Sequence, residues 1–591
     1  MTFSIRNANI TAIAIWIGAI FGIVEGGVLA VTRQFPTIGA PYKTSVHVLW
    51  VAPFLNVLLF LALAGVLRAI LFAFRRVKRR SLPADDPGSR SGHLESDVLI
   101  AVAVFTFLGV FGVISAPRVL HPASAAILAA GGGIAAFRAS RGHYALATKL
   151  RKFVMAIPVL LGSLILGTAG ALRAGEVFRG ERPPAQGILN VLLVVLDTVR
   201  RDHFWWAGGT SFTPNIDAFT SRGVRFDDAW SVSSWSLPAQ ASILTGVYPH
   251  EHGADWPSLA LSDRALTLGE YFSRRGYDTG AFSSNSSWIT PEYLGRGFDR
   301  FDVYTLEDHV RRTAYGRLLS AASRFIGLHY AGRGRPASDV SADLLDFVGE
   351  RRDRPFFAYV CYMDVNRAFH HRQLNHPFWE KRASVEEVVS AYAKGLRTLD
   401  ADFGDLIATL ERRGLLENTI VVITSDHGES FGARHAADRD PAGHGTSLFP
   451  EQTRVPLFVV LPSAIRNHRV VARTVSVRAI PATVSFLAGD STPQFDGPPL
   501  ITNDGDITSA GGDTAALATL HYDNRNSIAF ATGGWEYLRD GRGGRMAEHL
   551  IRVPLRPDDT HLSPQPSIST MRAGIAELLA ANVTATQAGS R

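Results

Sequence analysis

The chain has 591 residues, of which 46% are hydrophobic and 19% are charged. This composition excludes a disordered protein, and a soluble protein would have roughly 25% charged residues. The net charge of +7 comes from the apolar first third of the chain, so the remainder lacks the basic excess expected of a nucleic-acid-binding surface.

Five apolar stretches are predicted to cross a membrane, because a spanning helix needs about 20 apolar residues. They cover residues 10–32, 46–74, 98–116, 119–137 and 153–172. The fourth is short and contains Gly131, Gly132 and Gly133, so a re-entrant or buried hairpin is the alternative interpretation there. We therefore expect residues 1–180 to form a bundle of about five transmembrane helices.

Two loops between these stretches are strongly basic. Arg75–Ser96 and Arg138–Lys152 together contain eleven Lys and Arg and three acidic residues. With five spans both loops fall on one side, and Lys and Arg are enriched on the cytoplasmic side of membrane proteins. The pattern predicts a multi-pass protein of the cytoplasmic membrane, with its N-terminus in the cytoplasm and the chain after residue 172 in the periplasm or an equivalent extracytoplasmic space. We expect the first span to remain as a helix rather than to be cleaved as a signal peptide, because further spans follow it.

Glu25 is an acidic residue inside the first predicted span. Acidic residues in membrane helices often have a function, such as contact with a lipid headgroup or a cavity. Near the end of a span the same side chain can instead reach the water interface, and we expect this second arrangement for Glu25.

Three apolar runs in the second part of the chain predict buried strands, each followed by an acidic residue. They are Asn190–Leu196 before Asp197, Pro355–Met363 before Asp364, and Thr419–Ser425 before Asp426 and His427. Continuous apolar runs are typical of parallel strands that are covered on both faces. Ligands of open α/β sheets bind beyond the carboxyl ends of the strands, so an aspartate at such an end is well placed to bind a metal.

Helical stretches at 266–275 and 385–413 alternate with these strands and predict a layered α/β/α fold for residues 187–505. Residues 506–591 are expected to form a small α+β C-terminal subdomain, with a hairpin sheet and a final helix. Cys361 is the one cysteine in the chain, so an intrachain disulfide is excluded. Its place inside a predicted strand indicates a structural role.

Several polar motifs follow one another in a specific order. They are Val195-Leu-Asp197, Thr213-Pro-Asn-Ile-Asp217, the segment Ser234–Gly253, Gly276-Tyr-Asp-Thr-Gly-Ala281, Thr424-Ser-Asp-His-Gly-Glu429, Gly443-His-Gly-Thr446, Arg454-Val-Pro-Leu457 and Phe495-Asp-Gly497. In this order they resemble the sulfatase family of the alkaline-phosphatase superfamily. The resemblance covers about Gly187 to the C-terminus, and it implies a metal-dependent enzyme that acts on sulfate or phosphate esters.

The resemblance implies that Asp197, Asp426 and His427 bind one divalent metal ion and that Ser236 is the nucleophile that touches it. Coordination to a metal lowers the pKa of a hydroxyl and so activates a serine. Three oxygen ligands and one imidazole favour Zn²⁺ or Mn²⁺, with Ca²⁺ as an alternative. His444 matches the position of a family side chain that stabilises charge on the ester oxygens.

The sequence departs from the family pattern at several positions. Sulfatases that form formylglycine have Cys/Ser-x-Pro-x-Arg, whereas this chain has Ser236-Leu-Pro-Ala-Gln240, and the missing arginine argues against formylglycine at Ser236. The family's second strand-end aspartate falls at Thr198, its lysine near Asn285 and its histidine at Asn366. Gln240, Asn285 and Asn366 are therefore expected to be neutral substrate-binding residues.

These features predict a membrane-anchored, metal-dependent hydrolase or transferase of sulfate or phosphate esters. A substrate ester on a membrane lipid or an envelope glycan would explain the membrane spans, and no nucleic-acid partner is expected. One alternative is a membrane phosphotransferase of the phosphoethanolamine or phosphoglycerol type, which the five-span architecture resembles. A second alternative is a catalytically inactive membrane scaffold, for which the expected mark would be the loss of metal ligands.

Overall fold

A computed structural model of the chain describes residues 2–32, 47–80, 87–115, 122–140, 163, 167, 189–208, 212–325, 335–349, 354–368, 384–431, 443–462, 468–490, 494–501, 515–522, 525–542, 544–554 and 564–588. The chain divides into two compact units. The N-terminal unit contains Met1–Gly180 and Tyr304–Gly332, and the C-terminal unit contains Glu181–Val303 and Arg333–Arg591. The stretch Tyr304–Gly332 lies within the region that the sequence analysis assigns to the α/β domain, but it groups with the N-terminal helices.

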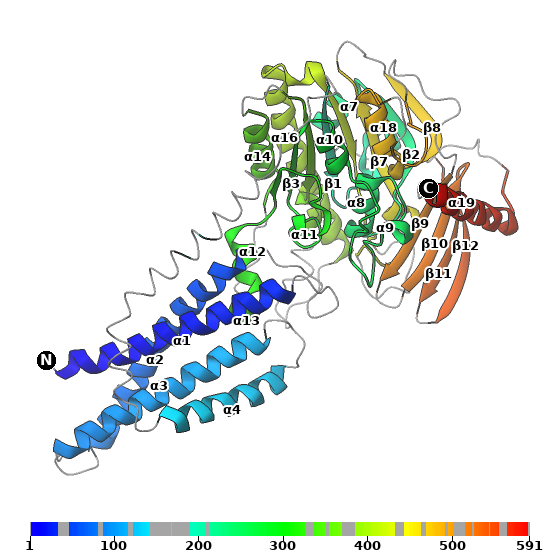
Figure 1. The fold of residues 1–591 in the computed structure, drawn as a ribbon. Helices are drawn as coiled ribbons and strands as arrows, with labels where there is room; N and C mark the ends of the chain where they lie inside the picture. Colours follow the sequence, from blue (N-terminus) through cyan, green and yellow to red (C-terminus); the bar gives the residue numbers. More distant parts are fainter. Residues whose placement is uncertain are drawn as a thin grey trace. The chain divides into compact units, whose positions relative to one another are not determined.

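The N-terminal unit is helical (Figure 1). Its helices are α1 (Thr2–Thr32), α2 (Val48–Arg80), α3 (Pro87–Ser115), α4 (Pro122–Ser140), α12 (Leu306–Arg312) and α13 (Ala314–Phe325). Among the described residues, three segments are long and apolar enough to cross a membrane, and these are Ile10–Ala30, Val48–Phe74 and Ser96–Ser115. The fourth predicted span corresponds to a shorter apolar helix, Ser124–Ser140. The fifth, at 153–172, lies outside the described residues apart from positions 163 and 167.

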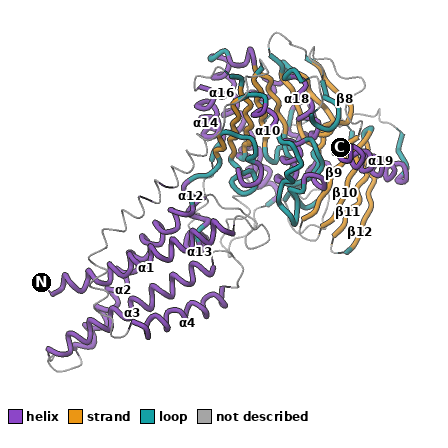
Figure 2. The backbone as a smooth tube through the Cα atoms, in the orientation of Figure 1, coloured by secondary structure: helices purple, strands orange, loops and turns teal. Residues whose placement is uncertain are grey.

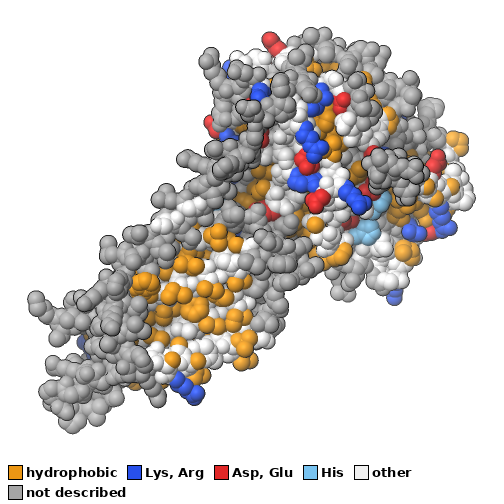
Figure 3. Space-filling view, viewed as in Figure 1, with side chains coloured by type: hydrophobic (Ala, Val, Ile, Leu, Met, Phe, Trp, Pro, Cys, Tyr) orange, Lys and Arg blue, Asp and Glu red, His pale blue; other side chains and the backbone are white. Residues whose placement is uncertain are grey.

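Apolar side chains lie on the outer surface of these helices (Figure 3). Phe72, Phe74 and Ile127, for example, are all exposed. A large apolar surface of this kind is unfavourable in water and is typical of contact with lipid or with another protein. The N-terminal helices are therefore suited to anchor the chain in a membrane.

Glu25 does not reach a water interface, so the expectation from the sequence is wrong. Its side chain is only 1% exposed. The carboxylate accepts hydrogen bonds from Asn56 Nδ2 at 2.8 Å and from the backbone N–H of Ala314 at 2.6 Å. Ala314 lies 289 residues further along the chain. No local pattern around Glu25 could have predicted that partner.

The C-terminal unit is built on a mixed sheet of eight strands (Figure 2). In chain order the strands are β1 (Asn190–Leu196), β2 (Val224–Trp230), β3 (Asp278–Ser283), β4 (Arg300–Asp302), β5 (Phe356–Tyr362), β6 (Thr419–Thr424), β7 (Arg454–Val460) and β8 (Arg469–Ser476). Their spatial order is β4-β3-β5-β1-β6-β7-β2-β8. The first five strands in this order are parallel, whereas β7 runs antiparallel to both of its neighbours. The three strands predicted from apolar runs are β5, β1 and β6, and they lie side by side in the sheet.

Helices cover both faces of this sheet, as Figure 1 shows. They are α7 (Pro214–Thr220), α8 (Ser236–Thr245), α10 (Leu268–Arg274), α14 (Ala337–Gly349), α16 (Val385–Arg412) and α18 (Ile480–Leu487), and shorter helices are α9 (Pro249–His252), α11 (Pro291–Leu294) and α17 (Pro450–Thr453). Alternate side chains of β1 enter different hydrophobic cores, so that Leu193 packs with α8, α10 and α18 and Val194 packs with α7, α14 and α16. The predicted α/β/α fold is confirmed, and a continuous apolar run is the pattern that such a doubly covered strand requires.

A four-stranded antiparallel sheet and a final helix complete the C-terminal unit. The elements are β9 (Ala515–Tyr522), β10 (Arg525–Thr532), β11 (Trp535–Arg542), β12 (Arg545–Arg552) and α19 (Ile568–Ala588). Phe530 and Tyr537 of this sheet pack against Met571 of α19. The predicted hairpin corresponds to β10 and β11, and the predicted last helix corresponds to α19.

Candidate active site

The three candidate metal ligands lie together where two central strands end. Asp197 directly follows β1, and Asp426 and His427 come shortly after β6. These strands are parallel neighbours in which Val195 pairs with Thr424, so their carboxyl ends coincide. All three side chains are fully buried. One ligand atom of each lies within 4.8 Å of the others, so the cluster can hold a metal ion.

Ser236 is the first residue of α8 and contacts this cluster. Its hydroxyl lies 3.4 Å from Asp197 Oδ2 and 3.2 Å from His427 Nε2. The preceding residue, Trp235, has an extended backbone, so the helix begins at Ser236. The N-terminus of a helix carries a partial positive charge that attracts the oxygens of an anionic group. The structure therefore brings the predicted nucleophile into contact with two of the three candidate ligands.

A backbone contact orients the ring of His427. Its Nδ1 lies 2.9 Å from the carbonyl oxygen of Gly428. Because a carbonyl oxygen only accepts hydrogen bonds, Nδ1 carries the proton and Nε2 keeps a free lone pair. Burial lowers the pKa of His427, which keeps the ring neutral. The unprotonated Nε2 therefore faces the cluster, in the arrangement that a metal ligand requires.

Neutral side chains hold the carboxylate of Asp197. Asn285 Nδ2 donates to Oδ2 at 3.0 Å, and Asn366 Nδ2 donates to Oδ1 at 3.0 Å. The hydroxyl of Thr198 donates to Oδ1 at 2.6 Å. Asn285 and Asn366, which the sequence analysis assigns to substrate binding, thus contact a candidate metal ligand. Their contact with substrate stays a prediction.

Thr198 links the two aspartates through a strained backbone. Its φ of 70° lies in the left-handed region that residues other than glycine rarely adopt. Its backbone N–H donates to Asp426 Oδ1 at 3.2 Å, while its hydroxyl bonds to Asp197. Strain of this kind costs on the order of 1 kcal/mol and persists where surrounding contacts hold it. The contacts of Thr198 could not be predicted from the sequence, because backbone strain leaves no mark in composition or periodicity.

Gln240 contacts the other candidate carboxylate ligand. Its Nε2 donates to Asp426 Oδ2 at 2.7 Å, and its Oε1 accepts a hydrogen bond from the hydroxyl of Tyr359. The amide must have this orientation because a carboxylate can only accept. Cys361 Sγ lies 3.4 Å from the same Nε2, and all of these side chains are fully buried. Gln240 thus gives Asp426 a neutral hydrogen bond, and Tyr359 is a supporting residue that the sequence analysis missed.

His444 lies beside His427, with ring centroids 4.4 Å apart. Its Nδ1 lies 2.8 Å from the carboxylate of Glu429, which is fully buried. Burial acts to lower the pKa of His444, but the Glu429 carboxylate outweighs it and the pKa is raised. His444 is therefore suited to donate a proton or a strong hydrogen bond. Glu429 is a site residue that was not predicted from the sequence, although it completes the Asp-His-Gly-Glu segment after β6.

The electrostatics of the cluster favour a cation. Asp197 and Asp426 are buried near each other, and amides, hydroxyls and backbone N–H groups donate to them. Burial and the charge of Asp197 raise the pKa of Asp426. Buried like charges are unfavourable unless a cation compensates them. Two carboxylates, one imidazole and one hydroxyl form a donor set that fits a divalent metal ion.

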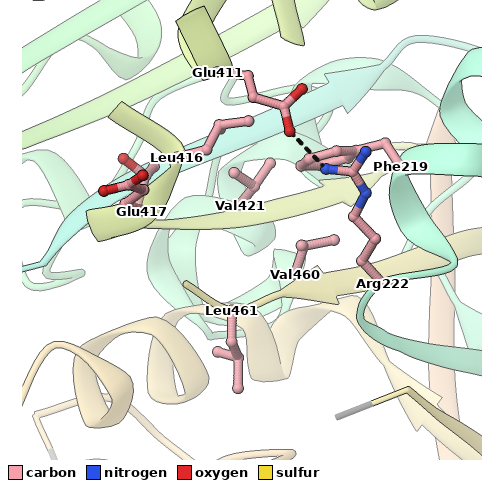
Figure 4. A pocket seen from close by; sticks show the side chains of 9 residues that line it. Phe219, Arg222, Glu411, Leu416, Glu417, Val421, Val460 and Leu461 are labelled. Carbon is pink, nitrogen blue, oxygen red and sulfur yellow. Dashed lines mark hydrogen bonds and ion pairs between the residues drawn. The ribbon is translucent and has the colours of Figure 1, made fainter. Parts of the chain in front are cut away.

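A cavity of about 130 Å³ lies elsewhere in the C-terminal unit (Figure 4). An ion pair between Arg222 and Glu411, at 3.1 Å, forms part of its wall. Thr419, the first residue of β6, also lines the cavity, whereas Asp426 follows the last residue of that strand. The cavity therefore lies at the other end of β6 and is not part of the candidate active site.

Comparison with solved structures identifies the fold. A putative sulfatase from Bacteroides thetaiotaomicron has a TM-score of 0.51 and 17% sequence identity, over 68% of this chain and 93% of that structure. A phosphonate monoester hydrolase from Silicibacter pomeroyi has a TM-score of 0.50 and 17% identity, over 67% of this chain and 95% of its own. At these identities the likeness shows a shared fold alone.

Curated proteins with similar sequences are named as sulfatases. An ulvan-active sulfatase from Formosa agariphila is 29% identical over 46% of this chain and 56% of its own length. An endo-4-O-sulfatase from Bacteroides thetaiotaomicron is 26% identical over 50% of this chain and 66% of its own length. The chain thus spans between about half and two thirds of the length of these relatives.

The family model described as Sulfatase matches residues 189–490, which is half of the chain. This range contains β1 to β8 and every residue of the candidate active site. The chain therefore belongs to the sulfatase family.

Proposed function

We propose that this protein is a membrane-anchored hydrolase that cleaves sulfate or phosphate esters outside the cytoplasmic membrane. The main support for this proposal is the position of Ser236 at the start of α8, where its hydroxyl contacts Asp197 and His427. The relatives point to sulfate esters of glycans, since their names include an ulvan-active sulfatase and an N-acetylgalactosamine-6-O-sulfatase. A glycan ester in the cell envelope is therefore the substrate class that we favour.

The residues of the site have separate roles in the proposed reaction. A divalent ion held by Asp197, Asp426 and His427, with Zn²⁺ or Mn²⁺ favoured, would supply positive charge that lowers the pKa of the Ser236 hydroxyl and neutralises the anionic ester. Ser236 gives its hydroxyl proton to solvent, its Oγ attacks the sulfur or phosphorus atom, and the bond to the alcohol oxygen of the substrate breaks. His444 donates a proton to that oxygen. Water then attacks the serine ester and gives one proton to Ser236 Oγ and one to His444, which releases sulfate or phosphate and restores both side chains.

We expect Ser236 to act as serine rather than as formylglycine. Gln240 is a neutral residue at the position where the modification motif has arginine. The mass of a tryptic peptide that contains Ser236 tests this expectation, because serine, formylglycine and a sulfated or phosphorylated serine differ in mass. A peptide with the mass of formylglycine would contradict it.

Hydrolysis is favoured over the two alternatives from the sequence analysis. The similar proteins and structures reported above are named as sulfatases or hydrolases, and none of those names is a transferase. A scaffold would be expected to lose metal ligands, whereas Asp197, Asp426 and His427 are present and lie together.

The first test is an assay of the full-length protein in detergent. Aryl sulfate, aryl phosphate and sulfated oligosaccharides serve as substrates, before and after removal of metal with a chelator. We expect the chelator to abolish turnover and Zn²⁺ or Mn²⁺ to restore it. Turnover that survives in metal-free protein would contradict the proposed role of the cluster.

The second test is the Ser236→Ala variant. Alanine has no oxygen that can attack the ester, so we expect turnover to fall by roughly 10³-fold or more while metal remains bound, with reduced affinity. Ser221→Ala is the matched control, because Ser221 is an exposed serine of the same unit. If Ser236→Ala kept nearly normal turnover, a covalent serine intermediate would be excluded.

A further inference from the structure

The segment Tyr304–Gly332 interrupts the sulfatase region of the chain and belongs to the N-terminal unit. The family match at residues 189–490 runs across it. Its two helices, α12 and α13, pack against α2 and α3. The chain therefore passes between the two units three times, after Gly180, Val303 and Gly332.

Glu25 binds the start of α13. Its carboxylate accepts the backbone N–H of Ala314, the first residue of that helix, at 2.6 Å, and it accepts Asn56 Nδ2 at 2.8 Å. A buried carboxylate in an apolar helix is costly unless it has partners. The free N–H groups and the positive end of a helix supply such a partner. Glu25 thus attaches α13 to α1 and, through Asn56, to α2.

Tyr315, the second residue of α13, enters the core of the N-terminal unit. Its ring lies 6.1 Å from that of Phe60, between centroids, and its hydroxyl donates to the carbonyl of Leu108. A Cβ atom added at Gly112 would lie 3.0 Å from the Tyr315 ring, so this glycine allows the close approach. Apolar packing and hydrogen bonds therefore hold the first turn of α13 against α2 and α3.

Two residues that the first turn of α13 contacts lie inside the apolar spans. Glu25, which accepts the Ala314 N–H, comes five residues before Ala30, and Leu108, which accepts the Tyr315 hydroxyl, comes seven residues before Ser115. At a rise of 1.5 Å per residue, these positions are about 7 to 11 Å from the ends of the spans. The contacted ends are those that the positive-inside pattern places outside the cytoplasm. The first turn of α13 therefore lies at the depth of the outer lipid leaflet.

Leu318 and Leu319 follow on the same helix and are 54% and 51% exposed. At this depth the medium beside the spans is the outer part of the hydrocarbon core. Two adjacent exposed leucines are suited to that medium and not to water. We propose that α13 is a membrane-inserted helix of the outer leaflet, attached by Glu25 and in contact with lipid through Leu318 and Leu319. This inference rests on the proposed membrane anchoring by α1, α2 and α3.

Spin labels on single cysteines test the inference. The one native cysteine, Cys361, is buried, so an introduced surface cysteine can be labelled selectively. Leu318→Cys and Leu319→Cys are labelled in full-length protein that is reconstituted in vesicles of phosphatidylcholine and phosphatidylglycerol. Collision of the label with oxygen, which is soluble in lipid, is compared with collision with a water-soluble nickel complex.

Two further labelled positions serve as references. Ile70→Cys, in the apolar span of α2, is the reference for contact with lipid, and Met546→Cys, on β12 of the C-terminal unit, is the reference for contact with water. Both native side chains are 59% exposed. We expect the oxygen-to-nickel ratio at Leu318 and Leu319 to resemble that at Ile70 and to exceed that at Met546 severalfold. If Leu318 and Leu319 resemble Met546 while Ile70 contacts lipid, the inference is overturned and the membrane anchor stands. If Ile70 also resembles Met546, membrane anchoring and the inference both fail.

The role of Glu25 is tested in the labelled Leu318→Cys protein. Glu25→Leu removes the acceptor for the Ala314 N–H, whereas Glu25→Gln keeps an acceptor oxygen. We expect Glu25→Leu to shift the ratio at Leu318 toward the value at Met546, and Glu25→Gln to shift it less. An unchanged ratio in Glu25→Leu would refute the attachment of α13 by Glu25.

Discussion

Neutral side-chain amides donate hydrogen bonds to the two aspartates among the candidate metal ligands. Gln240 donates to Asp426, and Asn285 and Asn366 donate to Asp197. An arginine at position 240 would form an ion pair with Asp426 and so reduce the negative charge available to a metal ion. A neutral amide orients the carboxylate and leaves its charge in place. We therefore expect these amides to affect the affinity for the metal ion more directly than any step of the reaction.

We predict that Gln240→Leu weakens metal binding. Asp426 Oδ2 would lose its side-chain donor and Tyr359 its acceptor, and the loss of such supporting contacts typically reduces metal affinity about 10- to 100-fold. Competition with a fluorescent chelator measures the affinity in purified full-length protein. Tyr359→Phe is the matched control, because it keeps the bond between Gln240 and Asp426, and its effect should be smaller. Equal metal affinity in Gln240→Leu and the native protein would contradict this role.

At the scale of elements, the Thr213–Asp217 motif forms the start of helix α7. Pro214 is the first residue of α7, where proline is well tolerated because the first N–H groups have no partner within the helix. The backbone N–H groups of Asn215 and Ile216 donate to the carboxylate of Asp400 at 3.1 and 2.8 Å. Asp400 is a buried residue of α16, so one side chain joins two helices on the same face of the sheet.

We predict that Asp400→Ala destabilises the C-terminal unit by about 2 kcal/mol, since two N–H groups and the Asn215 amide lose their acceptor. Urea unfolding followed by tryptophan fluorescence measures the change. Asp405→Ala, at an exposed position of the same helix, should alter stability little. Equal stability of the two variants would show that Asp400 does not join α7 to α16.

At the scale of the whole molecule, the two units differ in charge and in hydropathy. The basic segments Arg75–Ser96 and Arg138–Lys152 belong to the apolar first third of the sequence, and the candidate active site lies in a unit whose cores are formed on a mixed sheet. Loops rich in Lys and Arg stay in the cytoplasm, because their translocation across the membrane is unfavourable. The arrangement of charges therefore predicts the side of the membrane on which the site lies.

Reporter fusions test this topology. A fusion after Arg90 is expected to report the cytoplasm, and one after Arg182 is expected to report the extracytoplasmic side. Alkaline phosphatase and green fluorescent protein are suitable reporters because each is active on one side only. The opposite result at either position would contradict the five-span arrangement.

The sequence by itself determined the elements whose signals are local. Apolar runs identified β1, β5 and β6 because a strand covered on both faces needs apolar residues at every position. The same principle of continuous hydropathy identified the apolar helices α1, α2 and α3. Ordered motifs led to the candidates Asp197, Asp426, His427 and Ser236, because each lies shortly after a strand or begins a helix.

The tertiary structure alone decided which distant residues meet. Gln240 bonds to Asp426, Asp400 to Asn215 and Glu25 to Ala314, across 186, 185 and 289 residues of chain. Such pairs depend on how helices and strands pack, and neither periodicity nor a contiguous motif records them. Glu25 shows this most clearly, because its predicted contact with water was replaced by the first N–H of a helix that the sequence assigned to another domain.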